Sequence, residues 1–371
     1  MNVAVTELRR RPGRFVTATV ILTLLATLLL LLGGLLDGLL GGSTSALAAQ
    51  RGDVVVTSAT SENSFLRSRL DAATVARVAA APGVGEVGGL GVAQLGARVP
   101  GNGPRDLADV ALFGYRLPPE GVPAPPAEGE AYADRSLESS GVRVGATLRL
   151  GPARTPVKVV GWVDGLAYNG QGTLWATAAT WREVVNANRP GAALGPDTFQ
   201  ALVVRAASGT SPAALAASID RATDGATSSL TLADAVEAIP GVKEQRSTFN
   251  QIIGVTLVIA VVVVALFFAL LTVERTGLYG VLKAVGATSG RLFGGVVLQA
   301  VVVTAIAAAV GSALALFLDV VIPPGTIPYT LLPGRVLSSV LFLLVAAVVG
   351  CAFSLRRVLR IDPASAIGSS S

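Results

Sequence analysis

Residues able to do chemistry are few in this chain of 371 residues. It contains no His, and Cys351 is its single cysteine. A His-dependent zinc site, a His-based catalytic triad and an internal disulfide are therefore excluded. Two pairs of carboxylates, Asp106 with Asp109 and Glu128 with Glu130, lie in loop-like sequence, where solvated surface is the simplest interpretation. We therefore expect no catalytic constellation and no metal site in this chain.

A source of energy for transport is also missing from the sequence. No G-x-x-x-x-G-K-[ST] pattern occurs, so the chain has no P-loop for ATP. The Gly-x-Gly spacings in residues 83–91 lack the following acidic residue of a dinucleotide site. If this protein does work, another subunit must supply the energy.

Four uncharged segments dominate the rest of the chain. Hydrophobic residues make up 51% of the sequence and charged residues only 14%, whereas a soluble chain carries about 25% charge. A membrane-spanning helix needs roughly 20 apolar residues. The segments that reach this length without Asp, Glu, Lys or Arg are residues 15–36, 247–273, 292–318 and 336–355. They predict four spans and provide no ionisable group for an ion relay.

The charges around these segments predict their orientation. Residues 1–14, 274–291 and 356–371 carry net charges of +3, +2 and +2, and the rest of the chain sums to −2. Basic loops stay on the cytoplasmic side, so both termini are expected inside. The formal net charge of +5 is thus explained by topology, and a nucleic-acid partner is not expected. The first segment is too long for a signal peptide and is expected to remain as an anchor.

The expected fold class is an α-helical membrane protein with an extracytoplasmic α+β domain inserted between transmembrane helices 1 and 2. Strands are expected at residues 54–57, 147–150, 157–163 and 199–204, and helices at 64–80, 180–187 and 211–222. The predicted parts are the cytoplasmic tail 1–14, helix 15–40, outside domain 41–246, helix 247–273, cytoplasmic loop 274–291, helix 292–318, outside loop 319–335, helix 336–355 and cytoplasmic tail 356–371.

Five aromatic residues of the outside domain could line a binding cleft or pack in a core. Core packing is the simpler interpretation, because Trp and Tyr side chains bury large areas. The five are Tyr132, Trp162, Tyr168, Trp175 and Trp181.

The most specific pattern lies in the inner loop. Leu278, Val281, Leu282 and Val285 fall at helical spacing, and Gly286 would cap that helix. A short amphipathic helix of this kind can dock into a groove of a partner, or it can lie in the lipid headgroups. Spacing alone leaves both interpretations open.

This loop resembles the cytoplasmic loop of FtsX/MacB-type permeases of ATP-binding cassette (ABC) transporters. The matching residues are Glu274-Arg275 followed by Gly280-Val281-Leu282-Lys283-Ala284-Val285-Gly286-Ala287. Residues 360–367 at the tail and 141–148 with 159–161 in the outside domain resemble other parts of that family. The order of one span, a large outside domain and three spans is also similar.

The resemblance implies a homodimeric, non-catalytic subunit in the bacterial cell membrane that binds two copies of a separate ATPase. ATP and Mg²⁺ would bind that ATPase, and no cofactor would bind this chain. Motion would pass to the outside domain by mechanotransmission. The implied coupling residues are Glu274, Arg275, Gly280, Leu282, Lys283 and Gly286.

Two features bear on the family's contacts and substrate. Many members carry an acidic residue and Ile where this chain has Leu278 and Tyr279, so no ion pair with the ATPase is expected at Leu278. The start of the chain and residues 43–47 resemble the branch that contains haem-exporting permeases. Haem, lipid, drug and peptide all remain open as hydrophobic substrates.

Three functions remain open at this point. The chain could be an exporter permease, a signal relay that controls an outside cell-wall hydrolase, or a receptor without an ATPase. The inner loop separates the third function from the other two.

Overall fold

We describe a computed structural model of the chain, covering residues 13–103, 105–274, 281, 285, 288–322 and 327–358. The described chain divides into two compact units. The helical unit holds residues up to Gly38 and from Arg246 onward, and the sheet unit is Leu39–Gln245.

The helical unit consists of long apolar helices. Among the described residues, four helices are long and apolar enough to cross a membrane. They are α2 (Gly13–Ala48), α7 (Val242–Val273), α9 (Ser289–Val321) and α10 (Pro333–Val358). The last ten residues of α2 and the first four of α7 belong to the sheet unit. The fold class of four apolar helices with an α+β domain between the first and second is confirmed.

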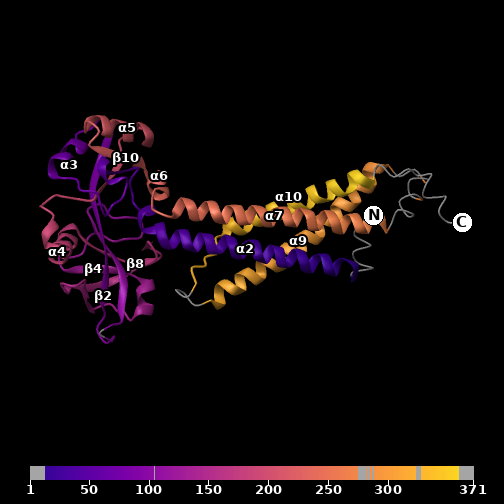
Figure 1. Ribbon diagram of the computed structural model, residues 1–371, viewed down its shortest axis with the longest axis horizontal. Coiled ribbons are helices and arrows are strands. Elements are labelled where there is room, and N and C mark those ends of the chain that lie inside the picture. The colour runs from indigo at the N-terminus through magenta and orange to yellow at the C-terminus, as the bar shows by residue number, and fades with distance from the viewer. Residues whose placement is uncertain are drawn as a thin grey trace. The chain divides into compact units, whose positions relative to one another are not determined.

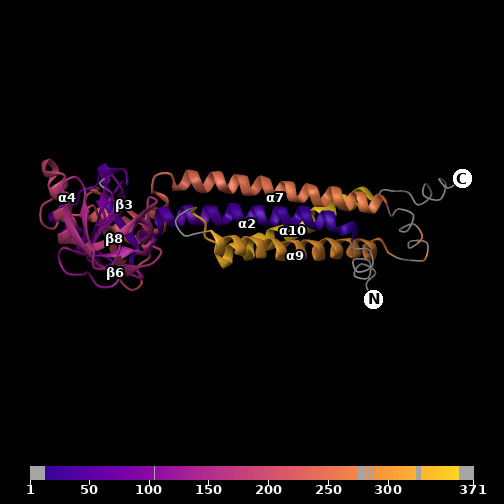
Figure 2. The ribbon, with the colours of Figure 1, turned by 90° about the horizontal axis from the view of Figure 1, so that it is seen from below.

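The four helices pack side by side in the helical unit (Figure 1, Figure 2). Buried side chains from all four form one cluster that includes Leu22, Phe268, Val303 and Ala347. Two glycines let backbones approach closely, as is common between membrane helices. Gly311 of α9 lies against α2 at Ala26, and Gly350 of α10 lies against α7. Gly254, Gly294 and Gly295, by contrast, have open space at the Cβ position.

The sheet unit holds a ten-stranded sheet. The strands are β1 (Val54–Ser58), β2 (Val84–Arg98), β3 (Leu107–Tyr115), β4 (Glu130–Asp134), β5 (Thr147–Leu150), β6 (Thr155–Val163), β7 (Ala167–Tyr168), β8 (Gln171–Thr177), β9 (Ala201–Ala206) and β10 (Thr227–Thr231). The helices are α3 (Ala72–Ala79), α4 (Ala178–Asn188), α5 (Pro212–Ala222) and α6 (Leu232–Glu237), with 3₁₀ turns at Ala59–Ser61, Arg135–Ser140 and Pro190–Ala192.

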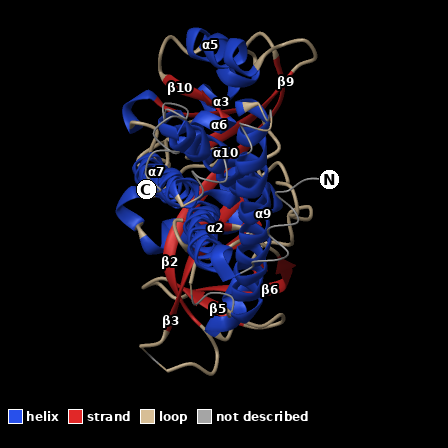
Figure 3. Cartoon of the chain, turned by 90° about the vertical axis from the view of Figure 1, so that its right-hand side faces the viewer, coloured by secondary structure: helices blue, strands red, loops and turns tan. Residues whose placement is uncertain are grey.

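The strand order is β10-β1-β9-β2-β3-β8-β4-β6-β5, with β5 also paired to β2. The second pairing closes β2, β3, β8, β4, β6 and β5 into a ring. Of the other four strands, β7 pairs with β8, and β9, β1 and β10 continue the sheet from β2. Helices α3 and α5 complete two β-α-β units, as in split βαβ folds. Figure 3 shows β9, β10 and α5 at one end of the unit and β3, β5 and β6 at the other.

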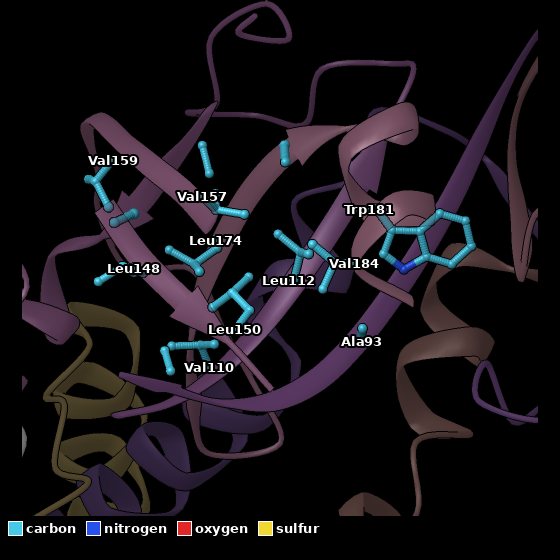
Figure 4. Close-up of a cluster of buried hydrophobic side chains, with 14 of the residues drawn as sticks. Ala93, Val110, Leu112, Leu148, Leu150, Val157, Val159, Leu174, Trp181 and Val184 are labelled. Carbon is cyan, nitrogen blue, oxygen red and sulfur yellow. The ribbon is translucent and has the colours of Figure 1, made fainter. Parts of the chain in front are cut away.

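Side chains alternate between the two faces of the sheet, because successive residues of a strand point to opposite faces. Three buried clusters result, one of which packs α3 and α5 against β1 and β9. Leu112, Leu148, Leu150, Val157 and Leu174 gather inside the ring (Figure 4). The opposite face of the sheet carries another cluster, which we call the junction core. Its members include Ala46 and Leu47 of α2, Val55, Phe113, Tyr115, Tyr168, Trp175, Val203, and Ala235, Ile239 and Val242 near the start of α7.

Most expected elements of this unit are present, with one clear error. The predicted hairpin is β5 with β6, and Ser211 caps α5 by accepting from the Ala214 N–H at 3.3 Å. The helix expected at 64–80 instead begins at Ala72. Leu70 is extended and exchanges two backbone hydrogen bonds with Phe199, of 2.8 and 3.0 Å. The Asp71 carboxylate then caps the helix at the Thr74 N–H.

Candidate functional site

The predicted coupling loop joins α7 to α9. Of the loop 274–291, the structure describes Glu274, Val281, Val285, Thr288 and the first three residues of α9, whereas Arg275, Gly280, Leu282, Lys283 and Gly286 lie outside the described residues. The Val285 N–H donates to the Val281 carbonyl at 3.1 Å, which is one helical turn. Both side chains are exposed, Val281 by 62% and Val285 by 82%. Two exposed valines four residues apart on one turn form an apolar surface suited to lipid or to a partner.

The other candidate residues do not form a chemical site. Asp106, Asp109 and Glu128 are exposed, and Glu130 pairs with Lys158 at 3.2 Å. In the described part of the chain, no three Asp, Glu, His or Cys side chains are placed to hold a metal ion. Cys351 is buried among apolar side chains of the helical unit.

The five aromatic residues are core rather than cleft. Trp175 stacks on Phe113 with ring centroids 4.6 Å apart, and Tyr168 meets Phe113 edge-on at 5.4 Å. Burial raises the pKa of Tyr168 to about 12. Trp181 is buried against two glycines, Gly91 of β2 and Gly114 of β3, where any Cβ would overlap the indole ring. Tyr132 and Trp162 are half-buried and pack against these cores.

The end of α2 is fixed within the sheet unit by packing and by hydrogen bonds. Ala46 and Leu47 have no exposed surface. The Ser45 hydroxyl accepts from the Ala167 N–H at 2.8 Å and also contacts the Ala167 carbonyl at 3.2 Å. Further bonds join the Asn169 N–H to the Ser43 carbonyl (3.1 Å), the Gly170 N–H to the Gly42 carbonyl (2.9 Å) and the Glu120 N–H to the Ala49 carbonyl (2.7 Å). Sequence reasoning missed this attachment, because its partners lie more than 70 residues further along the chain.

The start of α7 is attached differently. The chain leaves α6 at Glu237 and turns at Pro240 and Gly241 before α7 begins at Val242. Gly241 has φ +86°, a backbone conformation that favours glycine. Val242 is buried in the junction core, but the next turns of α7 are mostly exposed.

A comparison with known protein families identifies the C-terminal part of the chain. Residues 250–363 match the family model described as "FtsX-like permease C-terminal". The chain carries an FtsX-like permease domain. That domain includes almost all of α7, the loop 274–291, and helices α9 and α10. The chain is therefore a membrane protein, and its α2 and sheet unit lie outside the matched domain.

Two curated relatives from strains of Staphylococcus epidermidis are each named as a hemin transport system permease protein, HrtB. One is 24% identical over 130 residues, which is 35% of this chain and 37% of the relative. The other is 25% identical over 135 residues, 36% of this chain and 38% of the relative. The matches thus span little more than a third of each relative's length.

Two of the solved structures that resemble this chain are of a periplasmic region and an extracellular domain. The periplasmic region of MacB from Actinobacillus actinomycetemcomitans aligns with 10% identity and a TM-score of 0.36, covering 52% of this chain and 95% of that one. The extracellular domain of YknZ, a noncanonic ABC-type transporter from Gram-positive bacteria, aligns with 12% identity and a TM-score of 0.33, covering 48% of this chain and all of that domain.

Proposed function

We propose that this chain is the transmembrane subunit of an ABC transporter that moves a hydrophobic compound out of the membrane. The observation that carries the proposal is the FtsX-like permease match over residues 250–363, which encloses the loop 274–291 and the helices on both sides of it. The exposed apolar turn at Val281 and Val285 supports a docking role for that loop. A separate cytoplasmic ATPase would bind there, and that subunit would bind Mg²⁺ and ATP and hydrolyse the ATP.

The assembly and orientation are part of the same proposal. Two copies of this chain would pair and bind two ATPase subunits, as the resemblance to FtsX/MacB-type permeases implies. Both termini and the loop 274–291 would face the cytoplasm, because these three segments carry the positive charge. The sheet unit would then lie on the outer side of the cell membrane.

Haem is the first substrate to test, because both curated relatives are named for hemin transport. The chain has no His and its single Met is Met1, so a haem iron could only be bound by Tyr, Cys or carboxylate, or left without a protein ligand. Apolar contacts alone could hold haem as it leaves the bilayer. Lipids, hydrophobic drugs and peptides are the alternatives in the same assay.

The experiment is co-purification with the ATPase encoded beside this gene, followed by ATP hydrolysis rates of the complex in lipid. We expect a stable complex whose turnover changes when haem is added. Leu282→Asp and Gly286→Trp should abolish stimulation of the ATPase while the chain still inserts into the membrane. Val144→Asp is the matched control, since Val144 is an exposed apolar residue of the sheet unit.

Two outcomes would contradict the proposal. One is the absence of an ATPase from the purified protein, which would favour a receptor. The other is unchanged association and stimulation in both loop variants, which would show that the loop 274–291 does not dock. Turnover that responds to an outside protein and to none of the hydrophobic compounds would instead indicate a signal relay.

A further inference from the structure

An ion pair joins α2 to α10 within the helical unit. Asp37 is the single charged residue in residues 15–48, and Arg335 lies at the start of α10. The Arg335 Nε donates to Asp37 Oδ2 at 2.9 Å, and Nη2 donates to Oδ1 at 2.5 Å. The Asp37 side chain is only 10% exposed and that of Arg335 28%. Two parallel bonds between a carboxylate and a guanidinium fix both distance and orientation, so this pair resists sliding of the two helices.

The chain just before α10 lies directly on α2, at a row of glycines. A Cβ at Gly34 would overlap the ring of Tyr329, and one at Gly38 would overlap the Pro328 carbonyl. At Gly33 a Cβ would lie 2.7 Å from the Arg335 side chain. Glycine permits this approach to the Tyr329 ring and the Pro328 backbone, and at Gly33 an added Cβ would require the Arg335 side chain to shift.

Hydrogen bonds hold the same segment in place. The Thr330 N–H donates to the Gly34 carbonyl of α2 at 3.1 Å. The Tyr329 hydroxyl lies 3.4 Å from the Ala315 carbonyl of α9. The Arg335 N–H donates to the Leu332 carbonyl at 2.9 Å, which joins the segment to the first turn of α10. Residues 327–335 therefore contact α2, α9 and α10 together, and we call this set of contacts with Gly33, Gly34, Asp37 and Gly38 the clasp.

Helix α7 differs from its neighbours at the corresponding end. Ile252, Val255 and Val258 are 43%, 61% and 63% exposed, and Gly254 has open space around it. Leu29, Leu30 and Leu36 of α2, by contrast, are at most 2% exposed. Within the helical unit the clasped end of α2 is thus enclosed, whereas the start of α7 is not.

The clasp also joins the matched permease domain to a helix outside it. α9 and α10 belong to the FtsX-like domain at residues 250–363, and α2 does not. If α2 takes part in the motion that begins at the loop 274–291, that motion must pass from α9 and α10 to α2. Contiguous packed contacts with a charged pair at their centre are a physical route for such coupling.

We propose that Asp37, Arg335 and Tyr329 are positioning residues that make α2 and α10 move as one body during transport. This inference rests on the proposed function, since it assigns the clasp a role in coupling ATP hydrolysis to substrate movement. Opening the clasp should leave ATPase binding and hydrolysis in place and should lower the amount of substrate moved per ATP.

The test uses two glycine variants of the same helix together with a charge variant. Gly34→Ala adds one methyl group beneath Tyr329, whereas Gly41→Ala adds the same group where nothing lies within 4 Å. Asp37→Asn removes the ion pair with little change of shape. All three variants are made in the full chain in lipid nanodiscs. Because two different variants are expected to open the clasp, failure of one of them to fold does not decide the result.

Hydrogen–deuterium exchange on the chain alone, without the ATPase, measures whether the clasp is closed. We expect the amides of residues 329–332 to exchange about tenfold faster or more in Gly34→Ala and Asp37→Asn, and at the wild-type rate in Gly41→Ala. Coupling in the complex is measured as the amount of haem transferred to a haem-free acceptor protein per ATP hydrolysed. That ratio should fall in the first two variants and stay at the wild-type value in the third.

The other outcomes would contradict the clasp itself, its coupling role or the proposed function. Wild-type exchange rates in both Gly34→Ala and Asp37→Asn would show that the clasp does not form. Faster exchange with an unchanged ratio would overturn the coupling role and leave the proposed function intact. Failure of the wild-type chain to bind an ATPase would remove the proposed function and the coupling role together, whereas the exchange rates would still decide whether the clasp exists.

Discussion

Two helices, α2 and α7, have residues in both units, and they differ in how the sheet unit holds them. α2 is one unbroken helix from Gly13 to Ala48, and its end is buried and hydrogen-bonded to the segments at Glu120 and at 167–170. α7 begins immediately after a turn at Pro240 and Gly241. The sheet unit thus holds the end of α2 by packing and several hydrogen bonds, whereas α7 begins at a turn, and we expect the α2 connection to be the stiffer of the two.

The sequence of each segment explains the difference. Residues 43–47 of α2 are Ser-Thr-Ser-Ala-Leu, so three small polar side chains precede the two apolar side chains that enter the junction core. The Thr44 hydroxyl donates to the Leu40 carbonyl at 2.7 Å, and Leu47 fills the junction core. Pro240, by contrast, has no N–H to continue a helix, and Gly241 adopts a positive φ. A helix cannot pass through that turn.

The largest expected effect comes from placing a charge at the stiff connection. Leu47→Asp would bury an unpaired carboxylate among aromatic side chains and should destabilise the sheet unit by about 4 kcal/mol or more. All three Trp residues lie in this unit, so tryptophan fluorescence during chemical denaturation reports its unfolding. Val144→Asp, at an exposed site, should leave the midpoint unchanged. A similar midpoint for Leu47→Asp and the wild type would mean that α2 is not fixed in this core.

A smaller effect is expected from Ser45→Ala, which leaves the Ala167 N–H without its acceptor. The expected loss is about 1–2 kcal/mol in the same denaturation experiment. Ser247→Ala on α7 is the matched control, because the Ser247 hydroxyl accepts a long bond of 3.3 Å from Gln251 on an exposed face. Equal losses in the two variants would erase the distinction between the two connections.

The smallest effect should come from the turn before α7. Gly241→Ala forces a residue with a Cβ into a left-handed conformation and should cost about 1 kcal/mol. Gly41→Ala, at a helical position with open space, should be neutral or slightly stabilising, since Ala favours helix. If Gly241→Ala were as stable as Gly41→Ala, the turn would not require its positive φ.

Local patterns in the sequence predicted the parts of this fold that depend on near neighbours. Long uncharged runs predicted the four apolar helices, and Ser211-Pro212 predicted the start of α5. The helix expected from Ser64 was wrong because the backbone pairing of Leu70 with Phe199 competes with it. That pairing joins residues far apart in the chain, so periodicity gives no sign of it.

The contacts that matter most for the proposals are also non-local. The second pairing of β2, with β5, closes the ring of strands, yet β2 alone reads as a glycine-rich segment without a partner. Asp37 and Arg335 are 298 positions apart. Their one sequence signal is a lone charge at the end of each apolar run, beside Gly33, Gly34 and Gly38. The coupling residues implied by the family resemblance stay a prediction, because most of them lie outside the described residues.

The most direct test of the account compares the two connections in the working complex. Hydrogen–deuterium exchange would be measured on the chain bound to its ATPase, without nucleotide and with ATP and vanadate. We predict that nucleotide changes exchange at residues 239–250, around the start of α7. The amides of Glu120, Asn169 and Gly170, which donate to carbonyls at the end of α2, should stay protected. Loss of protection at those three amides, with residues 239–250 unchanged, would contradict the assignment of α2 as the stiff connection.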